Sequence, residues 1–162
     1  FFLYHEDTDA SLRARIQGWK VVLESSSIVY HYYEFNKAKM NYYWMERNRW
    51  VLLLIYLRPW TVFLLSPLLF AFELAMIAFS VLRGWSDMKW KMLKEWGAPS
   101  YWHWIWTRRR EMQHRRTVSD KDLLRLSVSE VLFQEEAVNN PLLMHIGNPF
   151  MRWYWKVVHR WL

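Results

Sequence analysis

The sequence predicts an α/β segment at the start of the chain, followed by a mostly α-helical tail that associates with a membrane. Two observations indicate the α/β segment. The apolar run 1–4 is typical of a buried strand, and two further strand-like runs come after a short helix. A third observation indicates the tail: residues 61–82 are almost entirely apolar, in a chain with 13 Trp and a formal net charge of +7.

The short helix is expected over about residues 9–17. Thr8 or Asp9 can cap its start, and Gly18 is suited to end it in a left-handed conformation. Two strand-like runs then follow, separated by a polar turn: 20–23 and 28–30. Together with run 1–4, they are the residues for which the sequence predicts β structure.

The rest of the chain is expected to be helical. No Gly or Pro interrupts 35–57, so one long helix is expected there, and Pro59 would break it. As a helix, residues 61–82 would reach about 33 Å, roughly the thickness of a hydrocarbon core. Glu73 is the strongly polar residue of this segment. We expect it to face the preceding domain or a neighbouring helix, either paired or protonated.

A basic, tryptophan-rich segment follows Gly84. Four apolar side chains of this segment lie at helical spacing: Trp85, Met88, Met92 and Trp96. Its lysines would point mostly elsewhere, which is the pattern of a helix lying in a membrane interface. The arginines at 108–110 and 115–116 suit nucleic acid or anionic lipid. No nucleic-acid recognition motif accompanies them, so we expect membrane lipids and no nucleic acid as partners.

Composition limits the possible classes of protein. A chain that is 53% hydrophobic and 19% aromatic is unlike a plain soluble domain. The absence of Cys excludes disulfides, zinc–thiolate sites and thiol catalysis. The first residue is Phe within a strand pattern, without an initiator Met or a signal-peptide layout, so we expect a piece of a longer protein.

Residues 1–31 contain, in order, an apolar run, the acidic pair Glu6-Asp7, a helix with Arg13, the Gly18 stop, two strand-like runs and His31. This order of elements resembles the end of the catalytic domain of inverting family 2 glycosyltransferases, which has the GT-A fold. The E-R-N-R sequence at 46–49 resembles an element on the helix that leaves this domain. RRTVSDKDLL at 115–124 is similar to tails of prokaryotic members, whereas 127–162 resembles nothing that we recognise.

The resemblance implies that Asp7 is the catalytic base. Inverting sugar transfer needs a group that takes the proton of the acceptor hydroxyl as it attacks the anomeric carbon, and the aspartate of the family's Glu-Asp pair has this role. Glu6 would orient the site or contact the acceptor. Taken without its flanking elements, the acidic cluster would instead be read as a helix cap.

Three arginines are implied at the substrate site. Arg47 and Arg49, of the E-R-N-R element, could neutralise the donor diphosphate or bind a lipid phosphate. The alternative is a charge cluster that faces solvent or lipid headgroups. Arg13 matches the family's recurrent arginine after the acidic pair, and we expect it to bond Asp7 or Asp9.

The resemblance also implies a divalent metal, Mg or Mn, in the full-length enzyme. Its main ligands would lie outside this chain, because the family's metal-binding D-x-D comes much earlier than the D-x-D at 7–9. His31 either completes that metal site, since neutral imidazole can ligate Mn²⁺, or is a structural histidine at the domain edge.

The sequence therefore predicts the C-terminal part of a glycosyltransferase at the cytoplasmic face of the cell membrane, inactive by itself. The enzyme would transfer a sugar, with inversion, from a nucleotide-sugar donor to a lipid-linked or cell-surface glycan acceptor. The alternative is a non-enzymatic membrane anchor or scaffold protein. We expect five parts: the end of the catalytic domain, the exit helix, a hydrophobic membrane segment, basic aromatic interfacial helices and a helical tail, at 1–34, 35–58, 59–83, 84–118 and 119–162.

Overall fold

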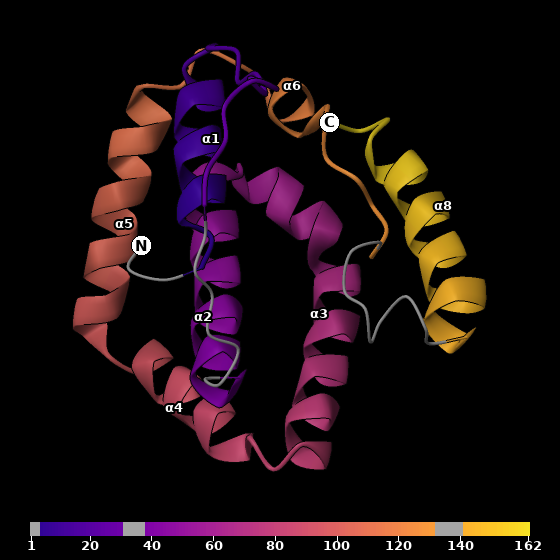
Figure 1. Ribbon diagram of the computed structural model, residues 1–162. Coiled ribbons are helices and arrows are strands. Elements are labelled where there is room, and N and C mark those ends of the chain that lie inside the picture. The colour runs from indigo at the N-terminus through magenta and orange to yellow at the C-terminus, as the bar shows by residue number, and fades with distance from the viewer. Residues whose placement is uncertain (1–3, 31–37, 132–140) are drawn as a thin grey trace.

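The computed structural model describes residues 4–30, 38–131 and 141–162. Within these ranges the chain forms helices joined by turns and contains no strand (Figure 1). The elements in chain order are α1 (Glu6–Ile16), α2 (Ala38–Tyr56), α3 (Pro59–Leu82), α4 (Ser86–Trp96), α5 (Pro99–His114), α6 (Asp120–Leu124), the π-helix η2 (Leu143–Gly147) and α8 (Asn148–Val158).

The prediction of an α/β segment at the start of the chain is wrong for the described residues. Runs 20–23 and 28–30 form no strand, and their side chains are exposed, Leu23 to 95%. An isolated two-stranded hairpin is only marginally stable in water, and the described part of the chain supplies no third strand to cover it. Of the run 1–4, only Tyr4 is described, and it lies in a bend. The described fold is therefore all-α.

Helix α1 begins earlier than expected and ends where expected. It begins at Glu6, after His5, whose side chain makes no capping hydrogen bond. At the other end Gly18 has a left-handed backbone, with φ of 81°, as predicted. The Gly18 amide bonds the Arg15 carbonyl (2.9 Å) and the Trp19 amide bonds the Ala14 carbonyl (3.1 Å), which satisfies two carbonyls of the last turn.

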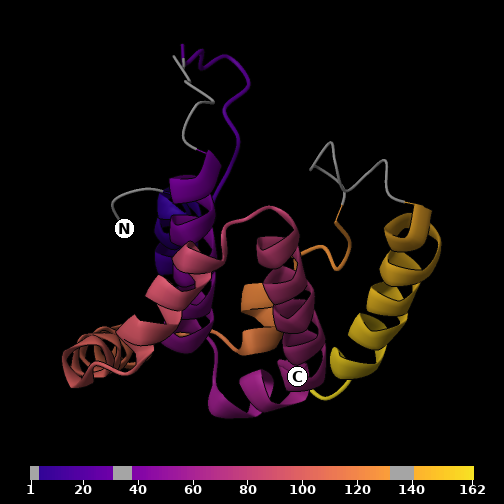
Figure 2. The same cartoon turned by 90° about the horizontal axis from the view of Figure 1, so that it is seen from below.

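Helices α2 and α3 form an antiparallel pair. Pro59 follows the end of α2 and is the first residue of α3. At this position of a helix the amide has no partner within the helix, so the missing amide proton of Pro costs nothing. The hydroxyl of Tyr42, near the start of α2, donates to the carbonyl of Met76 near the end of α3 (3.0 Å). Both views show α3 changing direction in its first half (Figures 1 and 2), which is the effect expected of Pro67 inside the helix.

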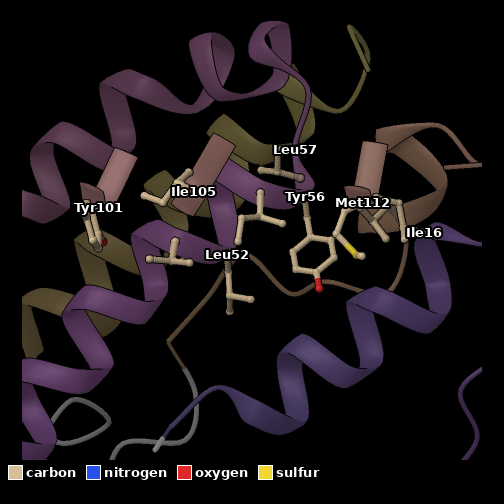
Figure 3. Close-up of a cluster of buried hydrophobic side chains, with 10 residues drawn as sticks. Ile16, Leu52, Tyr56, Leu57, Tyr101, Ile105 and Met112 are labelled. Carbon is tan, nitrogen blue, oxygen red and sulfur yellow. The ribbon is translucent and has the colours of Figure 1, made fainter. Parts of the chain in front are cut away.

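The core lies where α1, α2, α5 and α6 meet. Figure 3 shows Met112 of α5 between Tyr56 of α2 and Ile16 of α1, with Ile105 of α5 on the other side of Tyr56. Ile16, Tyr56 and Ile105 are at most 1% exposed. Each such apolar side chain contributes about 1.5–3 kcal/mol when fully buried. This core fixes the end of α1 against α2 and α5.

Helix α3 lies outside this core. Its most apolar stretch is not buried within the protein, and among the described residues α3 is the helix that is long and apolar enough to cross a membrane. On its outer side it contacts α8, where the Tyr154 hydroxyl donates to the Leu64 carbonyl (2.5 Å). The protein therefore presents a largely apolar helix to its surroundings.

Candidate functional site

The acidic pair lies on the first turn of α1, not at the exit of a described strand. The side chains of Glu6 and Asp7 are both exposed. The chain enters this turn through Tyr4 and His5, which have left-handed backbones with φ of 61° and 64°. The Thr8 amide donates to Asp7 Oδ1 (2.7 Å). The pair thus occupies the helix end whose dipole attracts negative charge.

The E-R-N-R element of α2 holds the start of α1 in place. Asn48 is fully buried, and its Nδ2 donates to the Tyr4 carbonyl (3.0 Å), directly ahead of the acidic pair. His5 is half-buried beside the Met45 backbone. Burial lowers the pKa of His5, although the neighbouring charge of Asp7 acts in the opposite direction. The start of α1 and the E-R-N-R element are therefore neighbours, joined by a contact between residues 44 positions apart in the sequence.

Two other residues of this element belong to a buried ion cluster, which we define as Glu46, Arg49, Glu73 and Lys89. Lys89 Nζ lies 2.7 Å from Glu46 Oε2 and 2.6 Å from Glu73 Oε1. Arg49 Nη2 lies 3.1 Å from Glu46 Oε2 and 3.0 Å from Glu73 Oε2. The indole of Trp50 also donates to Glu73 (3.0 Å). The cluster joins α2, α3 and α4.

The ion cluster balances two carboxylates with two cations. The prediction that Glu73 would face a neighbouring helix and be paired is confirmed. The expectation for the lysines of α4 is wrong for Lys89, which is 4% exposed and points into the protein. The carboxylates of Glu46 and Glu73 are the reason, since a buried ammonium needs anionic partners.

Arg47 points away from the ion cluster toward α4 and α5. Its Nε lies 2.8 Å from Glu95 Oε2, and its guanidinium lies 5.3 Å from the ring centre of Tyr101 and 5.7 Å from that of Trp104. The Tyr43 hydroxyl also donates to Glu95, and burial raises the pKa of Tyr43. Arg47 and Arg49 are thus both engaged within the protein and point to different neighbours.

Arg13 and Asp9 pair within α1, and Asp9 also joins this helix to α2. Arg13 Nη2 lies 2.5 Å from Asp9 Oδ2, as expected from the sequence, and this bond raises the pKa of Arg13. The Tyr56 hydroxyl donates to Asp9 Oδ1 (2.6 Å) in the core. Asp9 therefore does not cap α1, and the structure places Arg13 on Asp9 rather than beside Asp7.

Two arginines, Arg109 of α5 and Arg116 in the turn after it, act inside the fold. Arg109 donates to the Leu54 and Leu57 carbonyls, and Arg116 donates to the Tyr56 carbonyl at the end of α2. The last carbonyls of a helix lack partners within the helix, so these guanidinium groups cap it. The sequence analysis missed this role. No local pattern indicated it, because these contacts join residues that lie 52 to 60 positions apart in the sequence.

The metal expectation has no support within the described residues. They contain no group of three or more His, Asp or Glu side chains that could hold a metal ion. In the D-x-D at 7–9 the Asp9 carboxylate accepts hydrogen bonds from Tyr56 and Arg13. His31 lies outside the described residues.

Comparisons with protein-family models, with curated proteins and with solved structures find no match to this chain. The function proposed below is therefore argued from the residues and their geometry. Those that matter are the exposed acidic pair, the E-R-N-R element beneath it and the apolar surface of α3.

Proposed function

We propose that this chain is the C-terminal, membrane-associated part of an inverting glycosyltransferase similar to family 2. The enzyme transfers a sugar from a nucleotide-sugar donor to a lipid-linked or cell-surface glycan acceptor. The contact that supports this most strongly is the hydrogen bond from Asn48 to the Tyr4 carbonyl. It holds the two parts of the resemblance, the acidic pair and the E-R-N-R element, against each other.

In this proposal Asp7 accepts the proton of the acceptor hydroxyl. Its carboxylate is exposed, and its hydrogen bonds within the described residues are local, to the Thr8 amide and hydroxyl. An acceptor hydroxyl can therefore reach it. The Asn48 bond fixes the backbone directly before this turn, and the core contact at Ile16 holds the other end of α1. A base needs such a fixed backbone to hold its geometry. Residues outside this chain bind the donor and its metal.

We further propose that the protein acts at the cytoplasmic face of a membrane. Helix α3 supplies the apolar surface for membrane association, and the Lys- and Arg-rich segments on both sides of it are typical of cytoplasmic sequence. Lys39 and Asp87, which lie before and after α3, form an ion pair (2.8 Å). This contact supports the placement of both flanks on one side of the membrane.

A non-enzymatic membrane anchor or scaffold is the second candidate. The observation in its favour is that Arg47 and Arg49 are paired with Glu95, Glu46 and Glu73 inside the protein. Arginines engaged in this way stabilise helix packing and do not need a phosphate ligand. This candidate leaves the exposed acidic pair without a role.

The test is sugar transfer by the full-length protein that carries this chain, in membranes supplied with nucleotide sugars. Asp7→Asn keeps the shape of the side chain and removes its basicity, so turnover should fall by about 10²-fold or more with the fold intact. Asp87→Asn is the matched control, because Asp87 is also exposed and has the same place in the first turn of α4. It should retain transfer.

Two outcomes would decide against the proposal. Near wild-type turnover by Asp7→Asn would dismiss Asp7 as the base. Absence of transfer by the wild-type protein with every nucleotide sugar supplied, together with intact membrane binding, would favour the anchor. Circular dichroism of both variants checks that the helices are retained.

A further inference from the structure

An open cavity of about 310 Å³ lies between the end of α2, the first half of α3 and α5. Most of its lining is apolar. The side chains that matter for the argument are Val62, Phe63, Ser66, Trp102, Trp106 and Arg109. Ligand sites in proteins are mostly apolar with a few polar groups and have volumes of about 300–1,000 Å³. The cavity is thus large enough for part of a small apolar ligand.

One cationic side chain, that of Arg109, lines this apolar cavity. Its Nη1 donates to the carbonyls of Leu54 (2.5 Å) and Leu57 (2.7 Å), which fixes the guanidinium in place. Within the described part of the chain Arg109 forms no ion pair. Burial lowers the pKa of Arg109, and the nearby charge of Arg116 acts in the same direction, whereas Asp120 acts in the opposite one. The net lowering means that the charged guanidinium is not fully stabilised by its surroundings. An anion at this position would supply that stabilisation.

The cavity is continuous with the apolar surface of α3. Two of its lining side chains, Phe63 and Trp106, are 65% and 53% exposed. Trp60 stacks on Phe63, with ring centres 5.6 Å apart. Further along α3, Phe70 and Leu74 are also exposed. A chain that enters the cavity therefore passes over a surface suited to lipid and not to water.

We propose that this cavity holds one acyl chain of an anionic membrane phospholipid, whose phosphate lies at Arg109. The volume suits a segment of a single chain and not a whole lipid. A single fixed cation beside an apolar cavity matches a ligand with one phosphate at the end of a hydrocarbon chain. The site does not depend on sugar transfer, and a membrane anchor would use it equally well.

The first test fills the cavity. The chain is reconstituted in vesicles with equal amounts of dioleoyl phosphatidylglycerol and dioleoyl phosphatidylcholine, extracted into detergent and examined by native mass spectrometry for retained lipid. Ser66→Phe places a ring in the cavity and should reduce retained phosphatidylglycerol at least tenfold. Val81→Phe adds apolar area on the same helix outside the cavity and should leave retention unchanged. Equal retention by Ser66→Phe and wild type would overturn the site.

The second test removes the charge. Arg109→Gln should lower retention of phosphatidylglycerol to that of phosphatidylcholine. Arg110→Gln removes the same charge from an exposed neighbour that does not line the cavity, and should retain the preference. Equal loss in both variants, or no preference in the wild type, would overturn the role of Arg109. Stronger retention of undecaprenyl phosphate than of phosphatidylglycerol, at equal amounts, would overturn the assignment to a membrane phospholipid.

Discussion

Asp120 connects three parts of the chain through one buried carboxylate. Its Oδ2 accepts from the Arg58 amide (2.7 Å) and the Thr61 hydroxyl (2.5 Å), at the start of α3. Its Oδ1 lies 2.6 Å from Nη1 of Arg116, which also bonds the end of α2. The side chains of Asp120 and Arg116 are 4% and 5% exposed. Asp120 therefore sets the position at which α2 ends and α3 begins.

We predict that Asp120→Asn is strongly destabilising. The amide cannot neutralise Arg116, and breaking a buried ion pair costs about 3–5 kcal/mol. Urea unfolding in detergent, followed by circular dichroism, measures the change. Asp122→Asn is the control, because Asp122 lies on the same helix but is exposed and contacts Ser119 locally. Similar unfolding midpoints for the two variants would contradict the role given to Asp120.

His5 provides a pH-dependent contribution to stability. Burial lowers the pKa of His5 in the folded chain below its ordinary value of 6.5. Between these two pKa values the unfolded chain binds more protons, so stability rises with pH. The contribution is complete above about pH 6.5 and is lost as the pH falls through the folded pKa.

We predict that His5→Asn weakens this pH dependence. Asn does not titrate and tolerates the left-handed backbone that residue 5 adopts. Between pH 7 and pH 5 the melting temperature of the wild type should therefore fall further than that of the variant. If the melting temperatures of the wild type and of His5→Asn fell by the same amount over this pH range, the His5 imidazole would contribute nothing to the pH dependence.

At the scale of elements, the Gly and Pro residues of the sequence predicted the secondary structure better than its apolar runs did. Gly18 ends α1 and Pro59 begins α3 because backbone chemistry fixes their roles locally. The runs 20–23 and 28–30 have strand-like composition, but a strand also needs a neighbour, and that depends on residues far away. Local pattern therefore predicted helix ends well and β structure badly.

The contacts of the candidate site also fall into those that local sequence could predict and those that it could not. The Arg13–Asp9 pair and a partner for Glu73 could be predicted, because one follows helical spacing and the other follows from the cost of an unpaired carboxylate among apolar residues. The partnership of Lys89 with Glu46 could not, because it depends on the crossing of α2 and α4. The same holds for the contact of Asn48 with Tyr4.

We predict that Glu73→Gln loosens α3 from α2 and α4. Arg49 and Lys89 would then share Glu46 alone, which leaves an excess of buried positive charge. The expected loss is about 3 kcal/mol, at the lower end for a buried pair, because the Glu73 side chain is 15% exposed. The free energy of unfolding in detergent measures it.

The control for this prediction is Glu111→Gln. Glu111 also contacts two cations, Arg108 and Arg115, but on the surface of α5. Exposed pairs contribute about 0–1 kcal/mol, so this variant should be close to the wild type. A loss no larger for Glu73→Gln than for Glu111→Gln would mean that the ion cluster does not hold α3 in place.

At the scale of the whole molecule, α2 and α3 form a hairpin whose open end is closed by α4. The ion pair of Lys39 with Asp87 and the contact of Tyr42 with Met76 both bring the start of α2 to the end of α3. If α3 spanned a bilayer in this arrangement, α2 would have to lie beside it through the hydrocarbon. Residues 46–49 of α2 are charged or strongly polar, which makes that costly.

We therefore predict that α3 lies in the plane of the membrane and that its two flanks are on the same side. Lys39→Cys and Lys94→Cys should be labelled from the same side by a membrane-impermeant maleimide, in right-side-out and inside-out vesicles. The chain has no native Cys, so each variant reports one position. Labelling after detergent gives the total for each. A straight span would put positions 39 and 94 on opposite sides, and it would also separate Lys39 from Asp87 and carry Glu73 into hydrocarbon away from Arg49 and Lys89. Opposite-side labelling would accordingly contradict both the in-plane helix and the packing of α4 on α2.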